Sequence, residues 1–199
     1  QFNVTIVGSI IIFIGAVFVN NFILSRFLGI CPFIGVSKRL SASLGMGLAV
    51  TFVMTVAGLL SYLEYHYILV PLKLTFLDII VFILTIASTV QLLEIILQRF
   101  VPSLYKSLGI YLPLITTNCA ILGVAQLNIL YKYDILSTLI FDFSSGLGFT
   151  IAIVLMAGIR EKLEFGNIPR SFQGAPIAFI IAGLMSLAFL GFTNLIPNP

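Results

Sequence analysis

The stretches LGICPFIGVS (Leu28–Ser37) and TTNCAILGVA (Thr116–Ala125) contain the only two cysteines of the 199-residue chain. Both read Cys-x-x-x-Gly-Val, from Cys31 and from Cys119. Pro32 directly follows the first cysteine, and proline disfavours helical geometry in the residue before it. A Thr-Thr-Asn run directly precedes the second cysteine. We therefore expect each cysteine to lie beside an interruption in a helix.

The composition around these stretches is that of a membrane protein. Apolar residues make up 60% of the chain and charged residues only 9%, against about 25% charged residues in soluble domains. So few polar groups cannot cover the surface of a soluble domain, whereas a lipid bilayer suits such a surface. The sequence predicts an all-α integral membrane protein with a single membrane domain over residues 1–199. The net charge of +3 gives no indication of a nucleic-acid partner.

Six apolar segments have about the length that a bilayer core requires, which is about 20 residues. They are residues 5–24, 44–63, 76–97, 109–125, 139–159 and 175–192. The fourth segment is short and polar, so we expect it to be irregular. The first is expected to remain as an anchor, because no basic residue precedes it as in a cleaved signal.

The basic residues indicate an orientation. Eight of the ten fall in the connections after the first, third and fifth segments: Arg26, Lys38, Arg39, Arg99, Lys106, Arg160, Lys162 and Arg170. Short basic connections stay in the cytoplasm. We therefore expect both termini on the outer side of the membrane.

A second repeated pattern follows each cysteine. The stretches SLGMGLAVTFVMTVAGLLSYLE (residues 43–64) and SSGLGFTIAIVLMAGIREKLE (residues 144–164) share Gly-x-Gly, an apolar run, Ala-Gly and a final Leu-Glu. This predicts two repeats, about 1–98 and about 103–199, with three segments each. An odd number of crossings inverts the second repeat relative to the first, and interrupted segments at corresponding places indicate a site near the bilayer midplane.

Two expectations follow from this arrangement. The cysteines should face inward from broken half-helices, because irregular backbone inside a membrane needs protein or a cavity beside it. The glycines Gly45, Gly47, Gly146 and Gly148 should be helix-packing contacts rather than a phosphate loop, because no strand precedes them.

Thiolates suit soft metals and iron–sulfur clusters, but a [2Fe–2S] cluster normally takes four protein ligands. The chain offers Cys31, Cys119 and a single histidine, His66, which lies outside the repeats among aromatic residues and is expected at the membrane interface. A four-thiolate site therefore requires a second chain. Inert packing of the cysteines and a disulfide between them remain as alternatives.

Three acidic residues fall within apolar segments: Asp78, Glu94 and Asp142. Intramembrane acids are candidates for ion paths. Glu94 is the first candidate in this chain and Asp78 the second. The simpler expectation for all three is a place near a segment end, within reach of headgroups or a lysine.

Four phrases resemble a known family over nearly the whole chain: VNNFILSRFLGICPFIGVSK, SLGMGLAVTFVMT, GIYLPLITTNCAILGVA and AGLMSLAFLGF. They are similar to the RnfA/NqrE family, the membrane subunits of the Rnf ion-translocating oxidoreductase complex and of the sodium-translocating NADH:quinone reductase. The phrases CPFIGVS and ITTNC look more like the Rnf members.

The resemblance implies a multi-pass subunit in the inner membrane of a bacterium. Its complex transfers electrons between ferredoxin and NAD and couples this transfer to translocation of Na⁺ or H⁺. It further implies that Cys31 and Cys119 supply half of an intramembrane [2Fe–2S] cluster. A homologous membrane subunit, RnfE in that complex, supplies the other half, and further Rnf subunits carry flavins and iron–sulfur centres. The chain would have no catalytic site of its own. The alternatives are NqrE of the quinone reductase, a secondary transporter and a structural scaffold.

Overall fold

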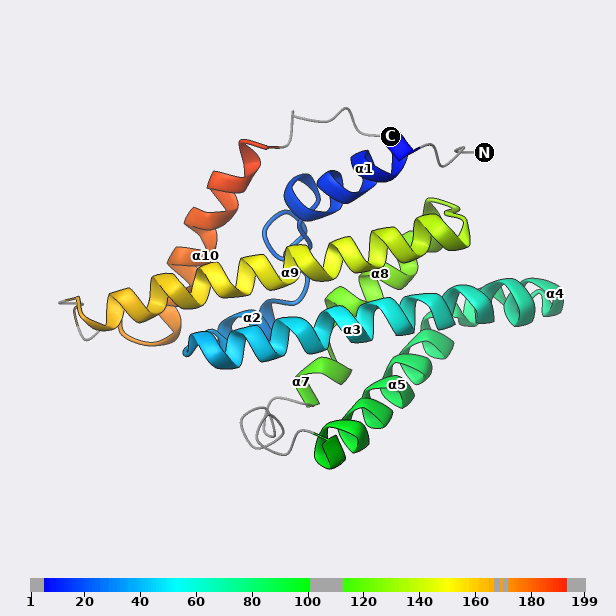
Figure 1. The fold of residues 1–199 in the computed structure, drawn as a ribbon, viewed down its shortest axis with the longest axis horizontal. Coiled ribbons are helices and arrows are strands. Elements are labelled where there is room, and N and C mark those ends of the chain that lie inside the picture. Colours follow the sequence, from blue (N-terminus) through cyan, green and yellow to red (C-terminus); the bar gives the residue numbers. More distant parts are fainter. Residues whose placement is uncertain (1–5, 101–112, 167–168, 170–171, 193–199) are drawn as a thin grey trace.

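The computed structural model describes residues 6–100, 113–166, 169 and 172–192, and all of its regular elements in these ranges are helical (Figure 1). In chain order they are α1 (Ile6–Ile14), the π-helix η1 (Gly15–Val19), α2 (Ile30–Val36), α3 (Leu40–Glu64), the π-helix η2 (Tyr65–Leu69), α4 (Val70–Leu72), the 3-10 helix η3 (Thr75–Leu77), α5 (Asp78–Phe100), α7 (Pro113–Thr116), α8 (Cys119–Leu130), α9 (Ile135–Glu164) and α10 (Ala175–Leu190).

Within the described ranges, three continuous helical stretches are long and apolar enough to cross a membrane: Leu40–Leu72, Thr75–Phe100 and Ile135–Glu164. They correspond to the second, third and fifth predicted segments. Three shorter apolar helices, Ile10–Val19, Leu114–Leu130 and Ala175–Leu190, fall on the first, fourth and sixth. The all-helical fold is confirmed for the described residues, and the interrupted character predicted for the fourth segment is found there as well.

The two longest helices, α3 and α9, lie side by side and run in opposite directions through the centre of the molecule (Figure 1). Glycines allow this close approach, because each one faces a threonine of the other helix. A Cβ on Gly47 would meet the Thr150 side chain at 2.6 Å, and one on Gly146 would meet the Thr51 backbone at 2.7 Å. The hydroxyl oxygens of the two threonines lie 3.1 Å apart.

The predicted packing role of the glycines is confirmed at Gly47, Gly146 and Gly148. The last lies against the backbone of Val17 in η1.

The first helical run ends at Val19, and residues 20–29 form turns until α2 begins. Asn21 is buried at this interruption and uses both ends of its amide. Its Oδ1 accepts hydrogen bonds from the amides of Ile23 (3.1 Å) and Leu24 (3.4 Å). Its Nδ2 donates to the carbonyls of Val17 (3.2 Å) and Gly148 (2.8 Å). The backbone groups that the broken helix frees are thus paired inside the protein, as they must be in lipid.

The second interruption separates α7 from α8. Asn118 is its buried N-cap, and its Oδ1 accepts a hydrogen bond from the amide of Ala120 at 3.0 Å. An asparagine at this position pairs one of the donors that the first turn of a helix leaves free. As a result, α8 begins directly at Cys119.

Candidate functional site

The two interruptions meet in space. The backbone amide of Gly29 donates a hydrogen bond to Sγ of Cys119 over 2.9 Å, across 90 residues of sequence. Gly29 is the N-cap of α2, and Cys31 is the second residue of that helix. The helix starts that carry the two cysteines therefore lie together.

Glycine is required at position 29 for two reasons. Its φ angle is +83°, a conformation that side chains disfavour. A Cβ there would also meet Phe149 Cε2 at 3.0 Å, and both Ala120 Cβ and Asn118 Oδ1 at 3.1 Å. Residue 29 thus joins both cysteine-bearing helices to α9 by close contact.

Both cysteines are free and exposed on this chain. The expectation that they face inward is wrong for the chain on its own. The helix breaks do place them together, but at the surface, because the buried positions beside them are taken by Pro32 and Phe33 on α2 and by Ala120 on α8. An exposed pair of thiols is accessible to ligands from a second chain.

The residues fit half of a thiolate cluster site. Two soft sulfur donors are accessible, and one of them accepts a backbone N–H, which stabilises the negative charge that a metal-bound thiolate carries. In the part of the chain that the structure describes, no three His, Cys, Asp or Glu side chains gather as a metal-binding group.

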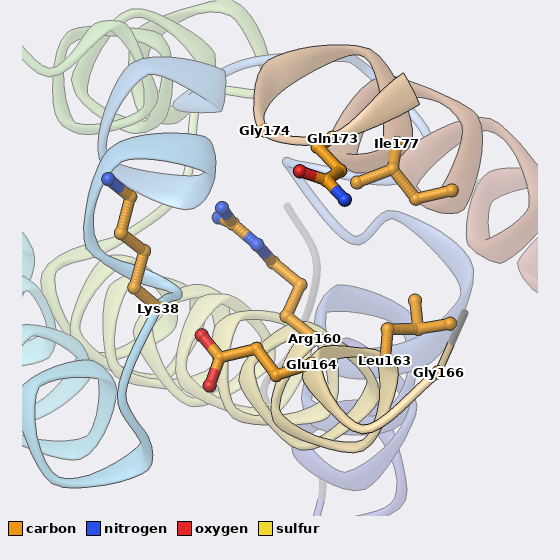
Figure 2. Close-up of a pocket in the computed structure, with 8 residues that line it drawn as sticks. All are labelled: Lys38, Arg160, Leu163, Glu164, Gly166, Gln173, Gly174 and Ile177. Atoms are coloured by element: carbon orange, nitrogen blue, oxygen red, sulfur yellow. The ribbon is translucent and has the colours of Figure 1, made fainter. Parts of the chain in front are cut away.

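Arg160 of α9 fixes the far end of α2. Its Nη1 donates to the carbonyl of Ile34 at 2.7 Å and to the hydroxyl of Ser37 at 2.9 Å. Figure 2 shows its guanidinium between Lys38 and Gln173 in a pocket of about 440 Å³. Arg160 thereby positions the short helix that begins beside Cys31.

Arg26 does not lie with these basic residues. Its Nη2 donates to the hydroxyl of Tyr131 at 3.0 Å, in the connection that leads into the start of α9. The Tyr131 ring packs on Phe141 of α9 with the centroids 6.3 Å apart. Arg160 lies about 28 Å further along the axis of that helix. Arg26 and Lys38 thus have different surroundings, and the orientation of the chain in the membrane stays a prediction.

The two candidate ion-path acids are not brought together. Asp78 is the first residue of α5, and its Oδ1 accepts from the amide of Ile79 at 2.7 Å. Its Oδ2 accepts from Nε2 of Gln126 at 3.1 Å. The half-buried Glu94 lies about 24 Å further along the same helix. Asp78 thus lies at the end of a helix, as the simpler expectation predicts.

Asp142 contradicts that simpler expectation. Its side chain is fully buried, and its Oδ1 accepts a hydrogen bond from Nδ2 of Asn128 at 2.7 Å. The reason is that α9 begins at Ile135, four residues before the predicted segment, so Asp142 lies two turns inside the helix. No pattern in the sequence points to Asn128, whose role depends on the packing of α8 against α9.

His66 is in the aromatic surroundings that the sequence predicts. Its ring stacks on that of Tyr62 with the centroids 5.0 Å apart. It belongs to no metal-binding group among the described side chains.

Comparisons with known proteins agree with the helical, apolar character of the chain. Residues 9–196 match the model of a family described as "Rnf-Nqr subunit, membrane protein". The A subunit of the Na(+)-translocating ferredoxin:NAD(+) oxidoreductase complex of Acetobacterium woodii is 56% identical over 186 residues, which cover 94% of this chain and 97% of the relative. The A subunit of the ion-translocating oxidoreductase complex of Syntrophotalea carbinolica is 53% identical over 95% of this chain and 98% of its own length. The protein of the same name from Actinobacillus pleuropneumoniae is 53% identical over 96% and 98%.

Proposed function

The chain belongs to the Rnf-Nqr family of membrane proteins, and from this premise we propose that it is the RnfA subunit of an Rnf-type complex. The complex couples electron transfer between ferredoxin and NAD to the translocation of Na⁺ or H⁺. The names of relatives that match nearly the whole chain support this assignment. They also favour it over NqrE of the sodium-translocating quinone reductase.

The site that serves this function is the pair Cys31 and Cys119. Together they supply two ligands of a [2Fe–2S] cluster, and a homologous membrane subunit of the RnfE type supplies two more. The single observation that carries the proposal is the hydrogen bond from the Gly29 amide to the Cys119 sulfur. It joins the starts of the two cysteine-bearing helices, and both thiols are exposed. Such a cluster supplies one-electron transfer, with the other Rnf subunits as donors and acceptors.

The chain's own residues hold and tune this site. The amide of Gly29 stabilises charge on the Cys119 sulfur, and Asn118 fixes the first turn of α8 behind it. The positive end of the α8 dipole points at Cys119, which favours an anionic ligand set there. Arg160 holds α2 in place through Ile34 and Ser37.

The architecture proposed for this subunit has six membrane segments in two inverted repeats, about 1–98 and about 103–199. The antiparallel packing of α3 on α9 supports it, because these two helices carry the second repeated pattern of each half. Helices interrupted before each cysteine support it as well. We place the subunit in the bacterial inner membrane with both termini outside the cytoplasm.

Electron paramagnetic resonance of the reduced, purified complex tests the cluster. Wild-type complex is expected to show a [2Fe–2S] signal that Cys31→Ala and Cys119→Ala each abolish, with a loss of about two iron atoms per complex. Leu130→Ala is the matched control, because Leu130 is an exposed residue at the opposite end of α8 (72%). Cysteine variants that keep the signal and the iron would contradict the assignment.

A secondary transporter is the second candidate, because broken helices and inverted repeats are also transporter features. A transporter without a cluster should tolerate both cysteine substitutions. The same spectra therefore separate the two functions.

A further inference from the structure

Five buried side-chain oxygen atoms in the described part of the chain have no hydrogen-bond partner. One is Gln126 Oε1, and the other four belong to three neighbouring helices. They are Ser61 Oγ, Asn128 Oδ1, Thr138 Oγ1 and Asp142 Oδ2. None of these residues is more than 3% exposed. Buried polar atoms are almost always paired, so an unpaired set of this kind indicates a missing ligand.

The four residues converge on one region between α3, α8 and α9. Asn128 of α8 donates to Oδ1 of Asp142. The other carboxylate oxygen lies directly against Gly58 of α3, where a Cβ would overlap it. Thr138 is one turn before Asp142 on the same face of α9, and Ser61 is about one turn beyond Gly58 on α3. Because the two helices are antiparallel, Ser61 and Thr138 come to the same level.

The chemistry of this set selects the ligand. All the free atoms are oxygens: one carboxylate, one amide carbonyl and two hydroxyls. Oxygen donors suit hard cations. A carboxylate with no cationic partner is costly in a buried site, so one positive charge is needed to balance it. A divalent ion would instead leave an excess positive charge in a low-dielectric region.

We propose that Ser61, Asn128, Thr138 and Asp142 form a binding site for a dehydrated monovalent cation, Na⁺, between α3, α8 and α9. That a cation binds here follows from the four oxygen atoms. That this cation is the translocated ion rests on the proposed function. Neither Glu94 nor Asp78 belongs to this set.

Helix α8 connects the cation site to the cysteines. It begins at Cys119 and carries Asn128 in its last turn, about 14 Å along the axis. Its dipole favours negative charge at the cysteine end and positive charge at the Asn128 end. A change of charge at the cysteines and a cation beside Asn128 therefore act on the same helix, α8.

Equilibrium binding of ²²Na⁺ to the purified complex tests the site, with choline chloride keeping the ionic strength constant. Asp142→Asn removes the charge and keeps the shape, so it should reduce the number of bound Na⁺ by one per complex. Thr138→Val removes one oxygen ligand and should weaken binding at the same site about tenfold. Ser145→Ala is the matched control, since Ser145 is equally buried on α9 but its hydroxyl donates to the Phe141 carbonyl at 2.7 Å.

Unchanged stoichiometry and affinity in Asp142→Asn and Thr138→Val would overturn the proposal. So would an infrared band of a protonated carboxyl that is lost in Asp142→Asn and does not respond to Na⁺, because the ligand would then be a proton. If Asp142→Asn does not assemble, Thr138→Val and Ser61→Ala decide the outcome. The [2Fe–2S] signal should persist in all these variants, so failure of the cation site is distinguishable from failure of the cysteine site.

Discussion

The amide of Gly29 donates a hydrogen bond to the sulfur of Cys119, and this contact joins the starts of α2 and α8. It relates two stretches that share the pattern Cys-x-x-x-Gly-Val and lie far apart in the chain. Both thiols reach the surface beside it. The proposed role of the protein depends on this contact.

Gly29→Ala should disrupt the cysteine site. The substituted residue would have to adopt φ near +83° and contact Phe149, Ala120 and Asn118 closely. The backbone conformation alone costs about 1–2 kcal/mol. We expect the purified complex to lose most of its cluster iron, measured by iron content and paramagnetic resonance.

Gly35→Ala is the control for that variant. Gly35 lies on α2 without a positive φ, and a Cβ there would have only Leu114 Cδ1 nearby, at 3.9 Å. Its iron content should equal that of wild type. Equal iron content in the Gly29 variant as well would contradict the role given to the Gly29 contact.

Arg160→Gln should loosen α2 without removing a thiol. The variant loses charge-assisted hydrogen bonds to Ile34 and Ser37, each worth about 1.5–3 kcal/mol in general. We expect a partial loss of iron and a broadened cluster signal, with partial recovery in Arg160→Lys. Lys162→Gln, an exposed change nearby on α9, should leave both unchanged. Full iron occupancy in Arg160→Gln would show that α2 is held by other contacts.

Gly146→Ala should destabilise the crossing of α3 and α9. The new Cβ would lie 2.7 Å from the Thr51 backbone, which cannot move aside as a side chain can. Overpacking of this kind costs about 1–3 kcal/mol, so the thermal unfolding temperature of the detergent-solubilised complex should fall. Gly158→Ala on the same helix has nothing within 4 Å and should leave it unchanged or raise it. The same unfolding temperature for both variants would argue against close packing at Gly146.

Asn21→Ala should open the first interruption. It would leave the amides of Ile23 and Leu24 without their partner in a buried region. The Gly148 carbonyl would lose the contact from Asn21 but lies within α9, where the helix itself pairs it. The expected loss is about 1–3 kcal/mol for each buried group left unpaired. The yield of assembled complex on size exclusion chromatography should drop, whereas the half-buried neighbour Asn20→Ala should assemble normally. Equal yields would contradict the structural role of the Asn21 amide.

The sequence predicts most of the helices, because lipid imposes length and apolar character on each segment. It also predicts a break near each cysteine, but the role given to Pro32 is wrong. Cys31 and Pro32 both lie inside α2, and the break ends at Gly29 with its positive φ. At the second break Asn118 of the Thr-Thr-Asn run caps α8. The outward direction of both thiols was not predictable. Helix breaks indicate where backbone is irregular, but they do not say which side of it faces a neighbour.

Asp142 shows a second limit of the sequence. Its burial depends on the start of α9 at Ile135 and on the approach of Asn128 from α8. Neither follows from hydropathy, because the deciding contacts join three helices. The contact of Arg26 with Tyr131 likewise depends on the path of residues 20–29, which a count of basic residues does not describe.

The most direct test of the cysteine site is a structure of the complete complex with anomalous scattering recorded at the iron edge. We predict iron scattering from one two-iron centre at the boundary with a homologous membrane subunit. Cys31 and Cys119 would supply two of its four thiolate ligands and the neighbour the other two. An intact complex in which either sulfur faces lipid, or in which no iron lies between the two subunits, would contradict this prediction.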